Sequence, residues 1–145
     1  MDAIVDYCDS LHRAGVIALW EKVFDYPTEH RLPSRSIDLK LAHGDRLFFV
    51  AIAKAQVIGT VLAGYDGHRG WLYSVSVDPE HRRQGIGEAL VRHAEAALAQ
   101  LGCLKINLQV VHTNGAIVPF YESLGYSVEP HISMGKRLYG RFDQP

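Results

Sequence analysis

The sequence contains little cysteine and no long apolar run. Cys8 and Cys103 are its only cysteines, which is too few for a disulfide framework and suggests two free thiols in a reducing cytosol. The longest purely apolar run, Leu47–Ala53, is far shorter than the roughly 20 residues that span a bilayer. The acidic N-terminus lacks the basic region and apolar core of a signal peptide. We therefore expect a cytoplasmic protein that does not interact with a membrane.

The sequence also lacks an excess of either charge. Its 15 basic and 16 acidic residues give a formal net charge of −1, so no overall field attracts DNA or an anionic membrane. The 8 histidines are never closer than 12 positions in the sequence, so the short spacings of metal ligands are missing. Accordingly, neither a nucleic-acid partner nor a metal is expected.

The composition is that of an ordinary globular domain. Apolar residues make up 48% of the chain and charged residues 21%, and both values lie in the usual range. The length of 145 residues suits one domain at about 100–200 residues per domain. Glycine and proline are dispersed, and no linker or repeat interrupts the chain. Residues 1–145 are therefore expected to form a single domain.

Periodicity and stop signals predict a mixed α/β fold. Helices are expected from Asp9 or Ser10 to Tyr26-Pro27, over Ser34–His43, over Ile86–Gln100 and around Pro119–Leu124. Strands are expected at Ile4–Cys8, Leu47–Ala53, Val57–Tyr65, Trp71–Val77, Leu104–Val111, Tyr126–Val128 and Ile132–Tyr139. This order predicts a mostly antiparallel sheet of about seven strands flanked by about four helices.

Two of these elements have a clear face. In the helix over Ile86–Gln100, one apolar face is expected to hold Ile86, Leu90, Val91, Ala94, Ala97, Leu98 and Leu101. In the strand Trp71–Val77, alternation is expected to place Trp71, Tyr73, Val75 and Val77 on one face and Leu72, Ser74 and Ser76 on the other.

The most informative segment follows that strand. A basic loop with Arg82 and Arg83 leads to Gly85 and Gly87, which open the strongest predicted helix. Unpaired N–H groups and the positive end of the helix dipole meet there, and glycines allow close approach. The segment predicts an anion site suited to phosphate or pyrophosphate. The alternative is a helix that merely begins at glycine beside two exposed arginines.

Two common phosphate motifs do not match this segment. A P-loop requires a lysine after its last glycine, and none follows Gly87. A dinucleotide fingerprint requires a glycine or alanine at the position of Leu90. That fingerprint also follows its strand directly, whereas here a loop separates the strand from Gly85.

Two blocks resemble the GCN5-related N-acetyltransferase (GNAT) superfamily, in particular its small bacterial single-domain members. Arg82, Gly85 and Gly87 match the pattern Arg/Gln-x-x-Gly-x-Gly/Ala, and Asn114 precedes Tyr121 by seven positions, as in that family's following helix. The resemblance implies a sheet splayed at its fourth and fifth strands. It also implies that acetyl-coenzyme A donates an acetyl group to a primary amine, of a small molecule or a peptide, by direct attack in a ternary complex.

The resemblance also implies roles for individual residues. The pyrophosphate would be held by the backbone N–H groups of Gln84, Gly85, Ile86 and Gly87 together with Glu88. Arg82 and Arg83 would lie alongside the phosphates, and the main chain of Val75 and Val77 would pair with the pantetheine arm, with Asn114 bonding it from the other side. Tyr121 would be the general acid that protonates the leaving thiolate; the alternative for Tyr121 is a core aromatic.

Several points stay open at this level. No carboxylate lies between Gly67 and Val77, so the base candidates are Asp66, Glu29, His112, and a water chain to Tyr73 or Ser74. Pro119 either breaks its helix or occupies its start, and in the second case Asn114 lies in a loop. The missing carboxylate motivates a second function, a non-catalytic module that senses acyl-coenzyme A. A third reading is an unrelated α/β domain. A homodimer through the C-terminal strands is also compatible with the resemblance.

Overall fold

The structure is a computed structural model that describes residues 1–25 and 28–140. The predicted helix stop at Tyr26-Pro27 lies outside the described residues. The chain divides into two compact units, Met1–Gln109 and Val110–Pro145, and each is described by itself. Throughout the described residues, every helix falls short of the length and apolarity that a membrane span requires.

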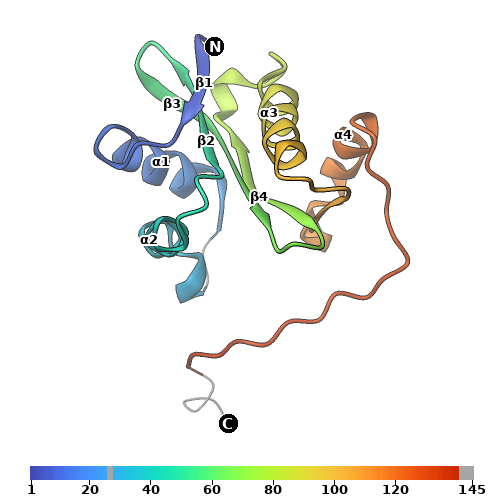
Figure 1. Cartoon of the computed structure of the whole chain (residues 1–145). Coiled ribbons are helices and arrows are strands. Elements are labelled where there is room, and N and C mark those ends of the chain that lie inside the picture. The colour runs from blue at the N-terminus through green and yellow to red at the C-terminus, as the bar shows by residue number, and fades with distance from the viewer. Residues whose placement is uncertain (26–27, 141–145) are drawn as a thin grey trace. The chain divides into compact units, whose positions relative to one another are not determined.

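The first unit is built on a five-stranded sheet (Figure 1). Its strands are β1 (Ala3–Asp6), β2 (Phe48–Ala53), β3 (Gln56–Tyr65), β4 (Gly70–Val77) and β5 (Ile106–Leu108), and they lie in sequence order across the sheet. The first three pairings are antiparallel and the β4–β5 pairing is parallel. The prediction of a mostly antiparallel sheet is therefore confirmed, although β5 is shorter than the predicted Leu104–Val111.

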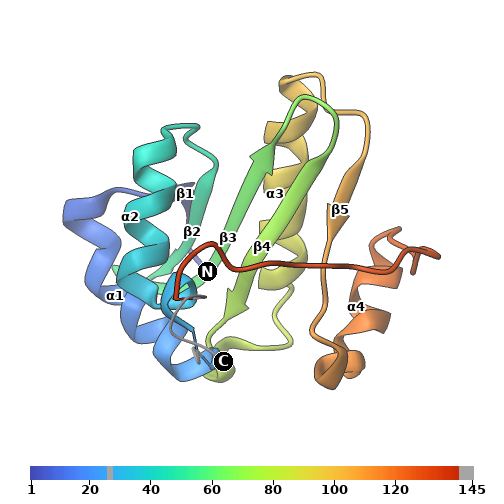
Figure 2. The same cartoon turned by 90° about the horizontal axis from the view of Figure 1, so that it is seen from below.

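Helices cover both faces of this sheet. On one side lie α1 (Asp9–Val23) and α2 (Pro33–His43), and on the other lies α3 (Ile86–Gln100) (Figures 1 and 2). With α4 (Val118–Ser123) in the second unit, the described residues contain the predicted four α-helices. The core between α1, α2 and the sheet consists of Val16, Leu19, Trp20, Ile37, Phe48, Val50 and Leu62. Burial of these side chains is the main force that holds the layers together.

The start of α3 lies close against β3 because of a glycine. Ile86, Leu90, Val91, Ala94 and Leu98 are buried, as the sequence predicted, whereas Leu101 is 54% exposed. A Cβ atom on Gly59 would lie 2.9 Å from Leu90 Cδ1 and 3.0 Å from the Ser76 carbonyl oxygen. Only glycine lets the helix and the strand approach this closely.

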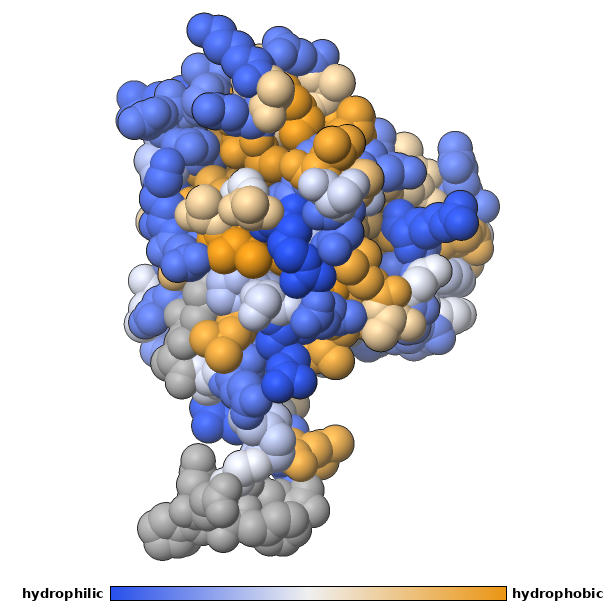
Figure 3. Space-filling view, turned by 90° about the vertical axis from the view of Figure 1, so that its left-hand side faces the viewer, coloured by the Kyte–Doolittle hydropathy of each residue, from blue (hydrophilic) through white to orange (hydrophobic). Residues whose placement is uncertain are grey.

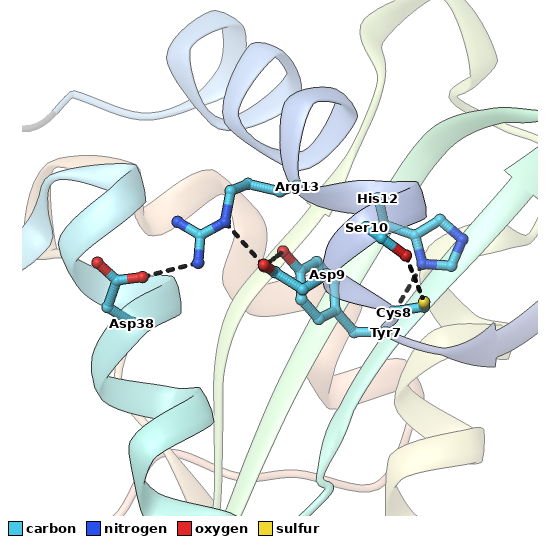
Figure 4. A network of polar contacts seen from close by, with 7 residues as sticks. All are labelled: Tyr7, Cys8, Asp9, Ser10, His12, Arg13 and Asp38. Carbon is cyan, nitrogen blue, oxygen red and sulfur yellow. Dashed lines mark hydrogen bonds and ion pairs between the residues drawn. The ribbon is translucent and has the colours of Figure 1, made fainter.

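A small polar network joins the start of α1 to α2 (Figure 4). The Arg13 guanidinium donates to Asp9 and to Asp38, each over 2.7 Å. The residue that precedes the first turn is Cys8 rather than the predicted Asp9 or Ser10. Asp9 instead lies in the first turn, where its carboxylate accepts from Tyr7 as well as from Arg13.

Both cysteines are free in the structure. Cys8 is exposed, and its Sγ lies 3.4 Å from Ser10 Oγ, a hydrogen bond that lowers the pKa of the thiol. Cys103 Sγ donates to the Lys105 carbonyl over 3.2 Å.

A buried lysine fastens α2 to the sheet. Lys40 Nζ lies 2.7 Å from an Asp45 carboxylate oxygen, donates to the Ala63 carbonyl oxygen, and lies 5.4 Å from the centre of the Tyr73 ring. Its side chain is only 5% exposed, so pairing with Asp45 is needed to offset the loss of hydration. The side of the molecule seen in Figure 3 carries apolar side chains among hydrophilic ones. Leu11 on α1 and Leu39 and Leu41 on α2 are exposed apolar residues.

The second unit has less regular structure than the sequence predicted. A 3₁₀ segment, His112–Ile117, leads directly into α4. The predicted strands Tyr126–Val128 and Ile132–Tyr139 are not formed, which corrects the expected count of about seven strands to five in the described residues. The apolar side chains of these segments are not covered in the described residues, since Val128, Ile132, Met134 and Leu138 are 77–91% exposed.

The close packing at Gly59 gives a stability prediction. Gly59→Ala is expected to lower the free energy of unfolding by about 1–3 kcal/mol, because the new methyl group has to push α3 away from β3. Urea denaturation measures this change. The matched control is Gly64→Ala on the same strand, where an added Cβ meets no atom within 4 Å. Equal stability of the two variants would contradict the proposed packing constraint.

Candidate functional site

The site expected from the sequence begins where β4 and β5 part. Their ladder holds only three residue pairs, from Gly70↔Ile106 to Leu72↔Leu108. Beyond it, β4 continues to Val77 without β5 along its edge, and Figure 2 shows the two strands diverging. The predicted splay between the fourth and fifth strands is therefore present.

One extra residue in β4 opposes β3 at this point. Thr60 pairs with Ser76 and Leu62 pairs with Tyr73, so a step of two residues on β3 matches a step of three on β4. The irregularity is a β-bulge, and Ser74 within it has a φ of +49°. The bulge corrects the predicted strict alternation, because Tyr73 and Ser76 now lie on the same face of the sheet.

The bulge decides which peptide groups face the open edge. Before it, the Gly70 N–H donates to the Lys105 carbonyl over 2.9 Å, toward β5. After it, the Asp78 N–H donates to the Ile58 carbonyl over 2.8 Å, toward β3. Because N–H directions alternate along a strand, Val77 faces the edge that β5 leaves open, and the same alternation predicts this orientation for Val75.

The loop after β4 is fixed at its first residue. One Asp78 carboxylate oxygen accepts from the Glu80 N–H over 3.0 Å and the other from Lys22 Nζ over 3.1 Å. The first of these bonds is the main cause that lowers the pKa of Asp78. The contact with Lys22 joins this loop to α1.

The basic loop then leads into α3, and the N–H groups at this junction make no hydrogen bond to the described part of the protein. Arg83 and Gly85 have φ angles of +63° and +78°, and α3 begins at Ile86. The first N–H that bonds back into the helix is that of Ala89, which donates to the Gly85 carbonyl over 3.0 Å. Among the described residues, no protein acceptor is found for the N–H groups of Gln84, Gly85, Ile86, Gly87 and Glu88.

The structure thus brings together most of the residues predicted to bind the cofactor. Arg82, Arg83, Gln84 and Gly85 are exposed, and an added Cβ on Gly85 would meet nothing within 4 Å. Consecutive free N–H donors at the positive end of a 15-residue helix, beside two guanidinium groups, can bind a phosphate or pyrophosphate without any rearrangement of hydrogen bonds.

Asn114 and Tyr121 belong to the second unit. Asn114 interrupts the 3₁₀ segment with non-helical angles (φ −111°, ψ 37°), and its N–H donates to the Val111 carbonyl over 2.8 Å. Pro119 lies in the first turn of α4, so Asn114 precedes that helix, as the second reading of Pro119 predicted.

Tyr121 lies among aromatic rings. Phe120 and Tyr126 place their ring centres 5.0 Å and 5.9 Å from its own, both edge-on. Burial raises the pKa of its phenol above the usual value of 10.0, so the group is protonated at neutral pH and able to donate a proton.

The candidate bases occupy different surroundings. Asp66 caps the β3–β4 turn by accepting from the His68 and Arg69 N–H groups, which lowers its pKa and its basicity. At 3.3 Å per residue, this turn lies about 15 Å along β4 from the bulge. Glu29 is exposed and paired with Arg35 over 3.0 Å. His112 is exposed and belongs to the second unit.

Tyr73 and Ser74, the two residues predicted to end a water chain, both lie on the open part of β4, and Ser74 is within the bulge. Tyr73 is the more exposed of the two. Tyr73 is 42% exposed, and it directly precedes the bulge.

Within the described residues, no group of three His, Cys, Asp or Glu side chains is arranged to hold a metal ion.

The sequence analysis missed the bulge and the buried Thr60 opposite it. The only signal was a threonine inside the otherwise apolar stretch from Ile58 to Ala63. Serine at a positive φ angle gave no signal, because that conformation usually calls for glycine.

Comparison with known proteins gives concordant findings. The sequence profile of the "Acetyltransferase (GNAT) family" matches residues 14–126. An acetyltransferase of Pectobacterium atrosepticum is 42% identical over 124 residues, which cover 86% of this chain and 87% of that protein.

Two solved structures share the fold. An aminoglycoside 6'-N-acetyltransferase of Acinetobacter haemolyticus has a TM-score of 0.74 at 20% identity and covers 94% of this chain and 99% of its own. The ribosomal-protein-S18-alanine N-acetyltransferase of Escherichia coli has a TM-score of 0.72 at 23% identity, covering 86% and 77%.

The environment of Tyr121 predicts its titration. Because burial favours the neutral phenol, Tyr121 should lose its proton only above pH 10.0. Stability from this group is present below that pH and is lost as the pH rises through the raised pKa. NMR of ring-labelled tyrosine, with Tyr121→Phe to assign the signal, measures the pKa. A Tyr121 signal that titrates at or below pH 10.0 would contradict the assigned burial.

Proposed function

Because the chain belongs to the GNAT family of acetyltransferases, we propose that it transfers an acetyl group from acetyl-coenzyme A to a primary amine. The amine attacks the thioester directly while both substrates are bound. One observation carries the donor assignment: the consecutive N–H groups from Gln84 to Glu88 have no protein acceptor in the described chain. They are proposed to bind the pyrophosphate.

The open edge of β4 is proposed to bind the pantetheine arm. The Val77 peptide group faces this edge, and that of Val75 is expected to do the same. The pantetheine arm contains two amide groups, which can pair with a strand edge as another strand would. Asn114 is proposed to hydrogen-bond the arm from the other side.

The transfer step needs proton movement at both ends. A primary ammonium has a pKa near 10.4 and has to lose a proton before it attacks. The negative charge that then forms on the thioester oxygen is proposed to be stabilised by an N–H on the open edge of β4. The protonated Tyr121 phenol is the proposed donor to the leaving thiolate.

The acceptor is proposed to bind on the side of β4 where Tyr73 lies. One fold neighbour is named for an aminoglycoside and the other for an alanine of ribosomal protein S18. An assay of thiol release from acetyl-coenzyme A against polyamines, aminoglycosides, and peptides with free N-termini or lysines separates these classes. Tight binding of coenzyme A without transfer to any of them would favour the acyl-coenzyme A sensing module instead.

The phosphate assignment predicts a selective loss. Arg82→Ala combined with Arg83→Ala should raise the KM for acetyl-coenzyme A by about 100-fold or more, because each of the two charge-assisted hydrogen bonds contributes about 1.5–3 kcal/mol. The KM for acetyl-pantetheine, which lacks the phosphates, should stay unchanged. Arg92→Ala, which removes a charge farther along α3, is the control. Equal losses with both donors would refute the assignment.

The acid assignment predicts a loss in turnover. Tyr121→Phe should lower kcat by about 100-fold and leave the KM for acetyl-coenzyme A nearly unchanged, because a general acid acts only in the transition state. Steady-state thiol release measures both constants. The loss should shrink with an acetyl donor whose thiol is more acidic, because such a leaving group needs less protonation. An unchanged kcat would assign Tyr121 to the aromatic core of its unit.

A further inference from the structure

We propose that Thr60 is a positioning residue for the donor site, because its buried hydroxyl holds the bulge that orients the open edge of β4. This inference rests on the proposed function, since that edge is where the pantetheine arm is proposed to bind. Thr60 itself lies on β3, is fully buried and touches neither substrate in the proposal.

The Thr60 hydroxyl is the centre of a buried hydrogen-bond cluster. It donates to the Ser74 carbonyl over 2.8 Å and accepts from Trp20 Nε1 over 2.9 Å. Ser76 Oγ lies 2.7 Å away. A hydroxyl has a single proton, and Thr60 uses it on Ser74, so Ser76 has to be the donor in the last contact.

The contact with Ser74 is the one that bears on the bulge. Ser74 is the residue with the positive φ angle, and a residue other than glycine pays about 1–2 kcal/mol for that conformation. Its carbonyl oxygen points into the protein and accepts a hydrogen bond from Thr60 Oγ1. The hydroxyl therefore gives this partly buried carbonyl a hydrogen-bond partner on β3.

Burial argues that this cluster is selected for more than packing. In the described residues, the buried polar or charged side chains are Lys40, Thr60 and Ser76, so the cluster accounts for two of the three. Valine has nearly the shape of threonine and would fill the same space without polar atoms. The hydroxyl serves two groups that valine could not serve: the carbonyl that the extra residue of β4 turns inward and the buried N–H of Trp20.

The consequence lies in the direction of the peptide groups. Without the extra residue, the alternation set by Gly70 would continue along β4, and Ser76 rather than Val77 would face the open edge. A slip of one residue would thus exchange the groups offered to the pantetheine arm. Thr60 keeps the register that offers Val77.

The experiment compares two substitutions in the full chain. Thr60→Val removes the hydroxyl and keeps the shape, whereas Thr60→Ser keeps the hydroxyl. Calorimetry with coenzyme A is expected to show an increase in Kd of tenfold or more for Thr60→Val and less than threefold for Thr60→Ser. Ile37→Val, a core change on α2 that leaves the hydroxyl of Thr60 in place, controls for a general loss of stability.

A second substitution tests the route through Ser74. Glycine adopts a positive φ without strain, so Ser74→Gly should preserve the bulge without the hydroxyl bond. Thr60→Val combined with Ser74→Gly is expected to recover most of the lost affinity, and it replaces Thr60→Val if that variant does not fold. Wild-type affinity in Thr60→Val, or no recovery in the double variant, would overturn the role of Thr60.

Amide hydrogen exchange separates this inference from the proposed function. Faster exchange at Ser76 and Asp78 in Thr60→Val than in the wild type would support the role of Thr60 in the register even if the wild-type protein binds no coenzyme A. In that case the proposed function fails and the structural role stands. Unchanged exchange together with unchanged coenzyme A binding would overturn the inference while the proposed function stands.

Discussion

The position of one additional residue in β4 governs the geometry of the proposed donor site. Strand pairing has a period of two, so a single inserted residue exchanges the peptide groups that face the neighbouring strand with those that face away. Here the insertion lies just after the point where β5 stops pairing with β4. The same short stretch therefore ends the ladder with β5 and determines which main-chain groups are left for a ligand.

Two adjacent residues of β3 support the two halves of this site from opposite faces. Gly59 faces α3 and lets the beginning of that helix lie close to the sheet. Thr60 faces α1 and holds the Ser74 carbonyl within the bulge. The N–H groups at the start of α3 and the open edge of β4 are thus both positioned by contacts with the same buried strand. These contacts give a defined shape to a site made largely of main-chain atoms.

Sequence reasoning predicted the elements that depend on periodic burial. The buried face of α3 and the strands β2, β3 and β4 were predicted because apolar residues recur at the spacing of a helix or a strand. The loop from Arg82 to Gly87 was found because charge and glycine accumulate at a predicted helix start. Its hydrogen-bonding state required the structure, since a free N–H leaves no mark in the sequence.

The remaining differences have physical causes that local patterns do not carry. The bulge at Ser74 depends on a partner fourteen residues earlier, Thr60, and is stabilised by a tertiary hydrogen bond rather than by turn-forming residues. The C-terminal segments Tyr126–Val128 and Ile132–Tyr139 were predicted as strands, yet a strand forms only by pairing with a neighbouring strand. Alternation is a property of the segment, whereas pairing is a property of its surroundings.

The contacts of the buried Lys40 have a chemical consequence for an enzyme that uses an activated acyl group. Acetyl-coenzyme A also modifies lysines in solution without any catalyst, wherever the amine is accessible and free of its proton. Lys40 is enclosed by Asp45, Ala63 and the Tyr73 ring, so the reagent cannot approach its nitrogen. The contact that joins α2 to the sheet is thereby shielded from modification by the proposed acetyl donor.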